Sequence, residues 1–391
     1  MSTIPSRFQQ MPDPPADPIF GLKALFNQDE RPHKLDLTAG VYKDEAGRTP
    51  AMDSVAAAQQ HLVAAEQTKD YLPIAGDASY CESVGDLVLP GGPAGSWFHT
   101  PSGTAALALA TRLVASAGAT RVWLPAPTWP NHAPIVASAG LEVATYPYGT
   151  RPEGRVEAIT EALAQVRRED IVLFHLCCHN PTGSDLSAAE WEQVAGFVSD
   201  RGLTVLLDAA YIGFADRPEV DRLPVAVLAD AAPELYVSTS FSKNFGLYRE
   251  RVGALHIGIS DAAERRRAFA TASSITRTIW SNPPWLGAAI VDLILRDDER
   301  RSAWTAELDA IRGRLNSTRG AIGAAFAERG LDAVAGIDDG RGMFHVADLT
   351  PEQVKVLRED HAVYMLSSGR FNVAALLPDG VAQLADAVAA L

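Results

Sequence analysis

The sequence predicts an α/β fold, in which helices cover both faces of a mostly parallel sheet and a smaller second domain accompanies it. Short apolar runs alternate with amphipathic helical segments through the middle of the chain, the pattern of a buried parallel sheet. The C-terminal part is largely helical instead. With 391 residues, the chain is too long for a single compact core, so two domains are expected.

Composition narrows the classes of partner. The hydrophobic fraction of 47% and the charged fraction of 21% are ordinary for a globular enzyme. The formal net charge of -14 argues against nucleic acid or an anionic membrane as the main partner. Residues 1–17 carry no apolar signal core, and no stretch has the roughly 18 uninterrupted apolar residues of a membrane span. A cytoplasmic protein is expected.

The three cysteines, Cys81, Cys177 and Cys178, are too few for a disulfide framework, and they fit a reducing compartment. Cys177 and Cys178 adjoin an apolar run, and no metal-ligand spacing accompanies them. We therefore expect a buried strand end there and no metal site.

The first expected element is a helix over residues 17–26. Asp17 is suited to cap it, Pro18 to occupy its first position, and the apolar residues at 19, 22, 25 and 26 share one face. A second helix, rich in alanine, is expected over 105–117 and a third over 188–199. The expected strands are 121–124, 141–146, 171–176, 203–207, 235–238 and 252–257.

From residue 261 to 330 the chain is rich in Ala, Glu, Arg and Leu, so we expect mostly helix. A shorter alternation follows: a strand over 343–347, a helix over 352–360, a strand near 370–374 and a closing alanine-rich helix. We expect residues 1–45 to form an N-terminal arm and part of the small domain, 46–300 the large cofactor-binding domain, and 301–391 the small C-terminal domain.

Polar residues follow the apolar strands at the points where the strands end. Asn180 comes after 171–176, Asp208 with Tyr211 after 203–207, and Lys243 after 235–238. In parallel sheets, ligands bind beyond the carboxyl ends of the strands. We therefore expect these side chains to converge at one edge of the sheet.

These residue types suit a pyridine-ring cofactor. Such a ring needs a carboxylate at its nitrogen, donors for its hydroxyl and a lysine for its aldehyde. Asp208, Asn180 with Tyr211, and Lys243 supply these in turn. The phosphate needs a helix N-terminus, hydroxyls and an arginine, and the candidates are Ser102, Gly103, Thr104, Ser240 and Arg251.

Several of these residues have simpler interpretations when taken alone. Asp208 after a strand could cap a helix, the tetrad Asn180-Pro181-Thr182-Gly183 could be only a turn, and Trp129 could be core packing. Arg277 could be a solvated charge near a helix end. His132 and His179 could be structural, and neither receives a catalytic role.

Taken together, the motifs resemble the aspartate and aromatic aminotransferases of class I, the fold-type I enzymes that use pyridoxal 5'-phosphate. The resemblance covers nearly the whole chain, in the family's order. It rests on these stretches: Leu37-Thr38-Ala39-Gly40-Val41-Tyr42-Lys43-Asp44-Glu45; Tyr71-Leu72-Pro73-Ile74-Ala75-Gly76; Pro127-Thr128-Trp129-Pro130-Asn131-His132; His179-Asn180-Pro181-Thr182-Gly183; Ser240-Phe241-Ser242-Lys243-Asn244-Phe245-Gly246-Leu247-Tyr248; Glu250-Arg251-Val252-Gly253; Trp280-Ser281-Asn282-Pro283-Pro284; and Ser368-Gly369-Arg370-Phe371-Asn372-Val373-Ala374.

The resemblance implies a role for each cofactor residue. Lys243 would bind the cofactor covalently and then act as the base at the substrate's α-carbon, and Asp208 would pair with the ring nitrogen. Asn180 and Tyr211 would face the ring oxygen, and Trp129 would stack on the ring. The phosphate would be held by Ser102, Gly103, Thr104, Ser240 and Arg251, with Tyr71 reaching it from the partner subunit.

For the substrate, the resemblance implies that Arg370 grips the α-carboxylate, with Trp129 and Asn180 beside it, and that Gly40 lies over the bound molecule. Arg277 would reach the distal carboxylate from the partner subunit of a homodimer. A guanidinium binds a carboxylate through two parallel hydrogen bonds, which a lysine cannot reproduce. Two such contacts would orient a dicarboxylate, and positioning of this kind can contribute roughly 7–11 kcal/mol.

The expected function is transfer of an amino group between L-aspartate, or a related acidic or aromatic amino acid, and 2-oxoglutarate. Departures from the family pattern near residues 37–40, 90–98, 280 and 343–348 lie around substrate-facing loops. They motivate an alternative, in which the same cofactor supports elimination or carbon–carbon bond formation in a specialised pathway. A silent binding protein on this scaffold would have lost the lysine or the carboxylate, and both are present.

Overall fold

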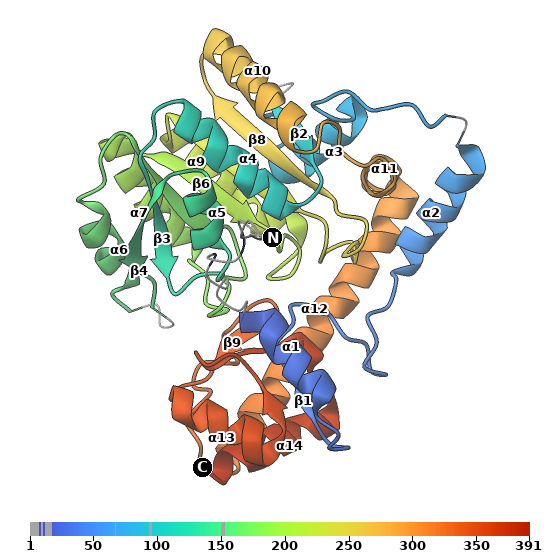
Figure 1. Ribbon diagram of the computed structural model, residues 1–391, viewed down its shortest axis with the longest axis vertical. Helices are drawn as coiled ribbons and strands as arrows, with labels where there is room; N and C mark the ends of the chain where they lie inside the picture. The colour runs from blue at the N-terminus through green and yellow to red at the C-terminus, as the bar shows by residue number, and fades with distance from the viewer. Residues whose placement is uncertain (1–7, 9–10, 12–17, 67, 94–95, 150–152) are drawn as a thin grey trace, which may run out of the picture.

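In the computed structural model, all residues are described except 1–7, 9–10, 12–17, 67, 94–95 and 150–152. Its centre is a seven-stranded sheet in the order β2-β8-β7-β6-β5-β3-β4 (Figure 1). Within the sheet, β8 alone runs antiparallel to its neighbours. The strands are β2 (Trp97–Thr100), β3 (Arg121–Ala126), β4 (Glu142–Pro147), β5 (Asp170–His175), β6 (Thr204–Ala209), β7 (Glu234–Ser240) and β8 (Gly253–Ile259).

Residues of the central strands alternate between two hydrophobic cores, one on each face of the sheet. Val172 and Phe174 pack into one core, whereas Ile171 and Leu173 pack into the other, as the two-residue period of a strand requires. Both faces are apolar, which is why these strands read as continuous hydrophobic runs.

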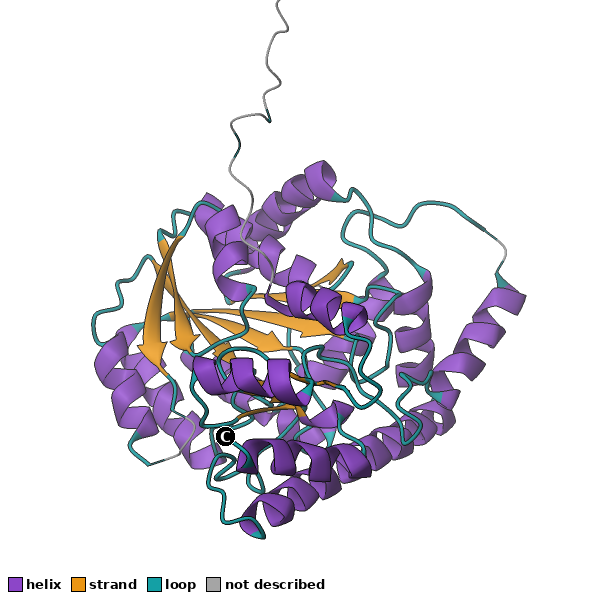
Figure 2. Ribbon diagram, turned by 60° about the horizontal axis from the view of Figure 1, so that its bottom comes forward, coloured by secondary structure: helices purple, strands orange, loops and turns teal. Residues whose placement is uncertain are grey.

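Helices cover the two faces (Figure 2). The first core includes residues of α3 (Ala78–Val88), α6 (Arg155–Leu163), α7 (Ala188–Arg201), α9 (Leu223–Ala231) and α11 (Leu286–Arg296). The second includes α4 (Gly103–Ser116), α5 (His132–Ser138) and α10 (Ala262–Ile279). Two further helices, α2 (Asp53–Ala65) and α8 (Pro218–Asp221), complete this part of the chain.

A third core joins the two ends of the described chain. It contains Leu37 from the N-terminal part and Ile322, Phe326, Val363 and Leu384 from the C-terminal part. Its elements are α1 (Pro18–Gln28), β1 (Leu35–Asp36), α12 (Asp298–Ala327), β9 (Phe344–Val346), α13 (Pro351–His361), β10 (Val363–Tyr364), β11 (Arg370–Asn372), a 3-10 turn η1 (Val373–Ala375) and α14 (Pro378–Ala389). Two small sheets, parallel β1-β10 and antiparallel β9-β11, hold it together.

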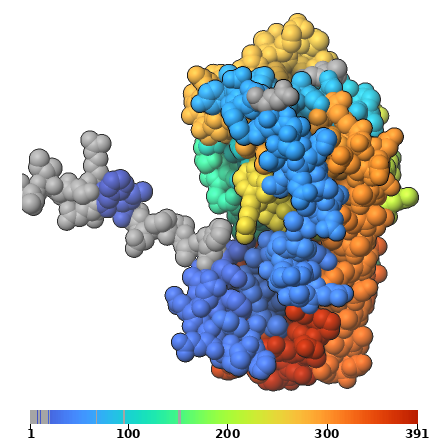
Figure 3. All heavy atoms as spheres, turned by 90° about the vertical axis from the view of Figure 1, so that its right-hand side faces the viewer, coloured from blue at the N-terminus to red at the C-terminus, as the bar shows by residue number. Residues whose placement is uncertain are grey.

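The long helix α12 belongs to both parts of the molecule. Trp304, Leu308 and Leu315 join the first core beside the large sheet, whereas Ile322 and Phe326 join the third core. Figure 3 shows the face on which the N-terminal third lies against the orange helices α11 and α12, with the C-terminal elements below. The predicted division at residues 45 and 300 stays a prediction, since α12 passes through one of these boundaries without a break.

The predicted α/β class and mostly parallel sheet are confirmed, and most predicted elements end within two residues of those observed. Two strands were predicted too long. The predicted strand 343–347 is limited to β9 (Phe344–Val346), and β11 ends at Asn372, whose side chain accepts the N–H of Ala374 and turns the chain into η1. The short strands β1, β2 and β10 were missed. The proposed cap Asp17 lies outside the described residues. No helix in the described part of the chain combines the length and apolarity needed to cross a bilayer.

Two histidines are buried with both ring nitrogens unpartnered within the described chain, namely His99 on β2 and His345 on β9. Burial lowers the pKa of each to about 3. In the unfolded chain the pKa of histidine is about 6.5. Below that pH the unfolded chain takes up protons that the folded protein excludes, so these residues favour folding at neutral pH and lose that contribution as pH falls from about 6.5 to about 3.

We therefore expect the free energy of unfolding to decrease with falling pH below about 6.5, by up to about 1.4 kcal/mol per pH unit for each of these histidines. Urea unfolding at a series of pH values would measure it. The variant His99→Gln should show a shallower slope, whereas exposed His61→Gln serves as the control. An unchanged slope in His99→Gln would contradict the assignment.

Candidate active site

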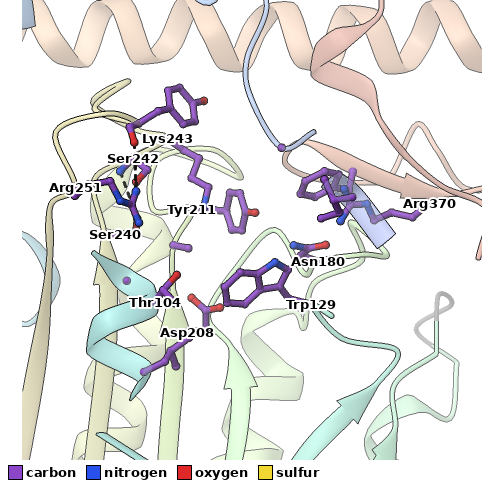
Figure 4. A pocket seen from close by; sticks show the side chains of 17 residues that line it. Thr104, Trp129, Asn180, Asp208, Tyr211, Ser240, Ser242, Lys243, Arg251 and Arg370 are labelled. Atoms are coloured by element: carbon purple, nitrogen blue, oxygen red, sulfur yellow. Dashed lines mark hydrogen bonds between the residues drawn. The ribbon is translucent and has the colours of Figure 1, made fainter. Parts of the chain in front are cut away.

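A cavity of about 360 Å³ opens beyond the carboxyl ends of β5, β6 and β7, between the large sheet and the β9-β11 pair. The strand register brings the ends of these strands together, because Asp208 pairs with His175 on one side and with Ser238 on the other. Most of the predicted site residues line the cavity (Figure 4): Gly40, Gly103, Thr104, Trp129, Asn180, Asp208, Tyr211, Ser240, Lys243, Arg251 and Arg370.

Asp208 is a buried carboxylate at the end of β6. Its Oδ2 lies 3.1 Å from Nε2 of His132, whose Nδ1 lies 2.8 Å from the hydroxyl of Thr128, and that hydroxyl lies 3.1 Å from His175 Nε2. Burial opposes ionisation of Asp208, but the hydrogen bond with His132 and the charge interactions with His132, His175 and Lys243 together outweigh it and keep the carboxyl pKa below its ordinary value. The site therefore holds a negative charge at this point.

His132, His175 and Asp208 each place a donor atom within 4.8 Å of the others, a spacing that a metal ion could use. The hydrogen bonds just described already engage His132 and Asp208 with each other and His175 with Thr128. We interpret the cluster as the support of the Asp208 carboxylate, since only Asp208 of the three lines the cavity.

Lys243 follows β7 and projects into the same cavity, with its Nζ 4.7 Å from the centre of the Tyr211 ring. No hydrogen bond engages this amine within the part of the chain that the structure describes. Burial lowers its pKa below the ordinary value, against the opposing charge of Asp208. A larger fraction of the amine is thus neutral at a given pH than for an exposed lysine, as a nucleophile or a base requires.

An anion-binding corner forms where α4 begins. Ser102 caps this helix through its hydroxyl, which accepts the N–H of Ala105, and the N–H groups of the first turn have no partner within a helix. Close packing requires glycine here, since a Cβ on Gly103 would lie 2.8 Å from that of Ser240. Arg251 completes the corner and donates to the hydroxyl of Ser242 at 3.3 Å. Ser102 supports the corner as the cap and is not among the lining residues.

At the opposite end of the cavity lies Arg370 on β11, buried to 1% exposure. It donates to the carbonyl of Thr38, and its carbon Cζ lies 4.2 Å from the centre of the Phe344 ring. Its Nε has no partner, and no carboxylate of the described chain pairs with it. Burial lowers its pKa to about 10, so it is still a cation at neutral pH. An uncompensated buried cation of this kind is a site for a carboxylate ligand.

The cavity fits a phosphorylated pyridine-ring cofactor. It offers an anion corner for the phosphate, a partly neutral amine for the aldehyde and an ionised carboxylate for the ring nitrogen. For the ring hydroxyl it offers the amide of Asn180, whose buried Oδ1 is unpartnered in the described chain, and Tyr211. Burial raises the pKa of the Tyr211 phenol, so this group stays protonated and able to donate.

Besides Ser102, two predicted site residues do not line the cavity. Tyr71 is 91% exposed. Arg277 is exposed in the last turn of α10, where it donates to the hydroxyl of Ser281. The Nδ2 of Asn282 donates to the carbonyl of Leu72 at 2.5 Å and links the two surface segments that carry them. Their predicted roles required a partner subunit, and these roles stay predictions.

Other lining residues were not predicted. Phe344 contributes a ring beside Arg370, Tyr248 is among the lining residues and Ile19 reaches the cavity from α1. Tyr248 also accepts the N–H of Tyr42 through its hydroxyl at 3.1 Å. The signal for Tyr248 was its place in the same motif as Lys243, residues 240–248, and His132 stood in the Trp129 motif. Ile19 had no signal, because its position depends on packing between the chain ends.

Comparison with known proteins agrees with this geometry. Residues 32–388 match the family described as aminotransferase class I and II. An aromatic-amino-acid aminotransferase of Pseudomonas aeruginosa is 42% identical, over 98% of each chain. The aspartate aminotransferase of Escherichia coli K12 is 40% identical, over 98% of this chain and 100% of its own length.

Solved structures agree as well. The aromatic-amino-acid aminotransferase from Burkholderia pseudomallei, covalently bound to pyridoxal phosphate, superposes with a TM-score of 0.92 at 37% identity and covers 98% of this chain and 99% of its own. A cytoplasmic aspartate aminotransferase from Saccharomyces cerevisiae gives a TM-score of 0.91 at 30% identity, covering 98% of both chains.

The anion corner leads to a binding prediction. Replacing Arg251 by Gln removes a charged donor, and a hydrogen bond to a charged group contributes about 1.5–3 kcal/mol, so affinity for pyridoxal phosphate should fall by roughly tenfold to a hundredfold. Titration of the apoprotein, followed by absorbance, would measure it. Arg249→Gln is the matched control, since Arg249 is exposed in the same turn and does not line the cavity. Equal affinity in both variants would remove Arg251 from the corner.

Proposed function

Because the chain belongs to the class I and II aminotransferases, we propose that it moves an amino group between L-aspartate, or a related acidic or aromatic amino acid, and 2-oxoglutarate. It is an aminotransferase, and pyridoxal 5'-phosphate is its cofactor. The observation that carries the proposal is the single cavity that joins the amine of Lys243, the ionised Asp208 and the uncompensated guanidinium of Arg370.

The relatives named above are all aminotransferases, and this favours transamination over elimination or carbon–carbon bond formation. A silent binding protein is disfavoured too, because Lys243 and Asp208 both face the cavity. Pyridoxal phosphate supplies an aldehyde that takes up the amino group and a ring that accepts electrons from the carbon beside it. The protein must supply position, proton transfer and charge.

The residues of the phosphate end would hold the cofactor in place. We assign the phosphate to the N-terminus of α4 with Ser240 and Arg251, the ring nitrogen to Asp208, and the ring oxygen to Asn180 and Tyr211. Asp208 keeps a proton on that nitrogen, because its own pKa lies below the ordinary value and it stays negative. Trp129 adds an apolar wall that limits water at the ring.

The residues of the other end would orient the substrate. Arg370 holds the α-carboxylate through its fork of N–H groups, and Gly40 lies close to the Phe344 ring beside it, where a Cβ would come within 2.9 Å of Cζ. Glycine at position 40 thus leaves room for the Phe344 ring at this end of the cavity. Lys243 removes the proton from the α-carbon of the substrate and then donates it to another atom. The first of these transfers needs a neutral amine.

We propose that the working form is a cytoplasmic homodimer with shared active sites. Support comes from the exposure of Tyr71 and Arg277 on neighbouring segments, since an aromatic residue exposed to 91% within the described chain would gain burial against a second chain. Arg277 of one subunit would then face the distal end of the substrate held by its partner, and Tyr71 the phosphate.

The variant Lys243→Ala should lose turnover by several orders of magnitude while keeping its fold, because both covalent attachment and proton transfer depend on that amine. Addition of aspartate or glutamate to the wild-type holoenzyme should change the absorbance spectrum of the cofactor. Borohydride followed by peptide mapping should label residue 243. A wild-type holoenzyme whose spectrum responds to no amino acid would argue against transamination.

Sharing of sites can be tested with hybrid dimers. Mixing Lys243→Ala with Arg277→Ala subunits should restore activity towards aspartate, because one site of each hybrid has an intact Lys243 and receives an intact Arg277. With random exchange, about a quarter of all sites should be complete.

Mixing Lys243→Ala with Arg370→Met provides the control, since we assign both of these residues to the same subunit and no hybrid site then has both. Restoration in the control mixture, or none in the Arg277 mixture, would contradict the shared site.

A further inference from the structure

Like Arg370, Arg319 is a buried arginine without an ion pair in the described chain, and none of the roles assigned above uses it. It lies on α12 with 1% of its surface exposed. Its Nη2 is within hydrogen-bonding distance of three carbonyls, those of Phe344 at 2.7 Å and of Arg341 and Gly342 at 3.0 Å. Its Nη1 donates to the carbonyl of Ile337 at 3.2 Å. One guanidinium therefore binds four backbone carbonyls of the segment 337–344.

Burying the Arg319 guanidinium in this way costs free energy of folding. Within the described chain no carboxylate pairs with Arg319, and its Nε is unpartnered. Burial lowers its pKa to about 10, so it remains charged at neutral pH. A buried cation that is hydrogen-bonded only to carbonyls loses its hydration, and no ion pair compensates that loss. A neutral apolar residue would suffice if α12 only needed to pack here.

The segment held by Arg319 contacts the asparagine turn of the large domain. The N–H of Arg341 donates to the carbonyl of Gly183 at 2.6 Å. A Cβ on Gly183 would lie 2.5 Å from the carbonyl oxygen of Phe344 and 3.0 Å from Nη2 of Arg319. Gly183 ends the tetrad that begins with Asn180, which lines the cavity. The guanidinium thus lies where the two parts of the protein meet.

The same segment carries the ring that contacts the carboxylate-binding arginine. Phe344 gives its carbonyl to Arg319 and turns its ring towards Arg370, 4.2 Å from the guanidinium carbon. Its backbone pairs with Asn372, two residues from Arg370 on β11. The side chain of Asn372 in turn donates to the carbonyls of Ala39 and Val41 on either side of Gly40.

We propose that Arg319 is a positioning residue for the substrate carboxylate, which acts by fixing Phe344 against Arg370 and the segment 341–344 against the turn of Asn180. The proposal rests on the function proposed above, since it assigns the carboxylate to Arg370. Arg319 touches neither substrate nor cofactor. Its loss should weaken binding of the amino acid and the 2-oxo acid and leave the phosphate corner intact.

The variant Arg319→Lys keeps the charge but cannot span four carbonyls. We expect the KM for both aspartate and 2-oxoglutarate to rise about tenfold or more, with a smaller change in kcat and no change in affinity for pyridoxal phosphate. Calorimetric titration of the holoenzyme with 2-oxoglutarate, without an amino donor, should show the same loss. Arg329→Lys is the matched control, because Arg329 binds the carbonyl of Ala325 and Asp386 away from the cavity.

A pair of glycine variants tests the same contact without changing the arginine. Gly183 and Gly202 both have positive φ, 68° and 60°, so alanine strains the backbone similarly at each. Alanine at 183 would push on the Phe344 carbonyl and Arg319, whereas alanine at 202 meets nothing within 4 Å. Gly183→Ala should reproduce the rise in KM and Gly202→Ala should not. If Arg319→Lys fails to fold, this pair decides the question.

Wild-type KM values in folded Arg319→Lys, or equal KM values in the two glycine variants, would overturn the proposal. The outcome is separable from the proposed function, which is judged on the wild-type enzyme. Loss of 2-oxoglutarate binding in Arg319→Lys with an inactive wild type would count against transamination and in favour of the positioning role. An active wild type with unaffected variants would support transamination and count against the positioning role of Arg319.

Discussion

The charge on Asp208 is the constraint on which the rest of the site depends. The carboxylate stands at the end of a strand that is buried on both faces, where ionisation is opposed by burial and is maintained through His132. The network continues through Thr128 to His175, so the carboxylate is linked to the segment 128–132 and, through it, to the end of β5. This charge also acts on Lys243 across the cavity and limits how far burial lowers the pKa of its amine. The two groups are therefore tuned together by the same strand ends.

Two of the buried arginines, Arg319 and Arg370, show two uses of an uncompensated cation. Arg370 is only partly satisfied, so it is ready for a carboxylate that comes from outside the chain. Arg319 is satisfied by backbone carbonyls and organises the segment that packs against Arg370. Phe344 lies between them and joins the two environments. Because neither arginine has an ion pair within the described chain, both sites bear an electrostatic cost that packing alone does not explain.

The site also depends on contacts between distant parts of the chain. Thr38 accepts a hydrogen bond from Arg370, 332 residues further along. Asn372 holds the segment 39–41 through hydrogen bonds to its carbonyls. The next residue, Tyr42, donates its N–H to the hydroxyl of Tyr248 in the loop after Lys243. The N- and C-terminal elements share one core, and α12 connects that core to the large sheet. Substrate binding in the cavity would therefore affect both the large sheet and the core formed by the chain ends.

Local sequence determined which elements form and which chemistry they bring. Runs such as 171–176 and 203–207 are largely apolar because both faces of the sheet are covered, and Asn180, Asp208 and Lys243 follow strands whose carboxyl ends meet at one edge. The cofactor residues could be predicted for that reason. Tertiary structure alone decided which side chains reach the cavity. Ile19 and Phe344 do so, and Arg319 lies beside Gly183, only because segments far apart in the chain pack together. Tyr71 and Arg277 have side chains that could bind a phosphate or a carboxylate, but both lie on the surface of this chain. The direction in which a side chain points is set by packing, and no local sequence pattern encodes it.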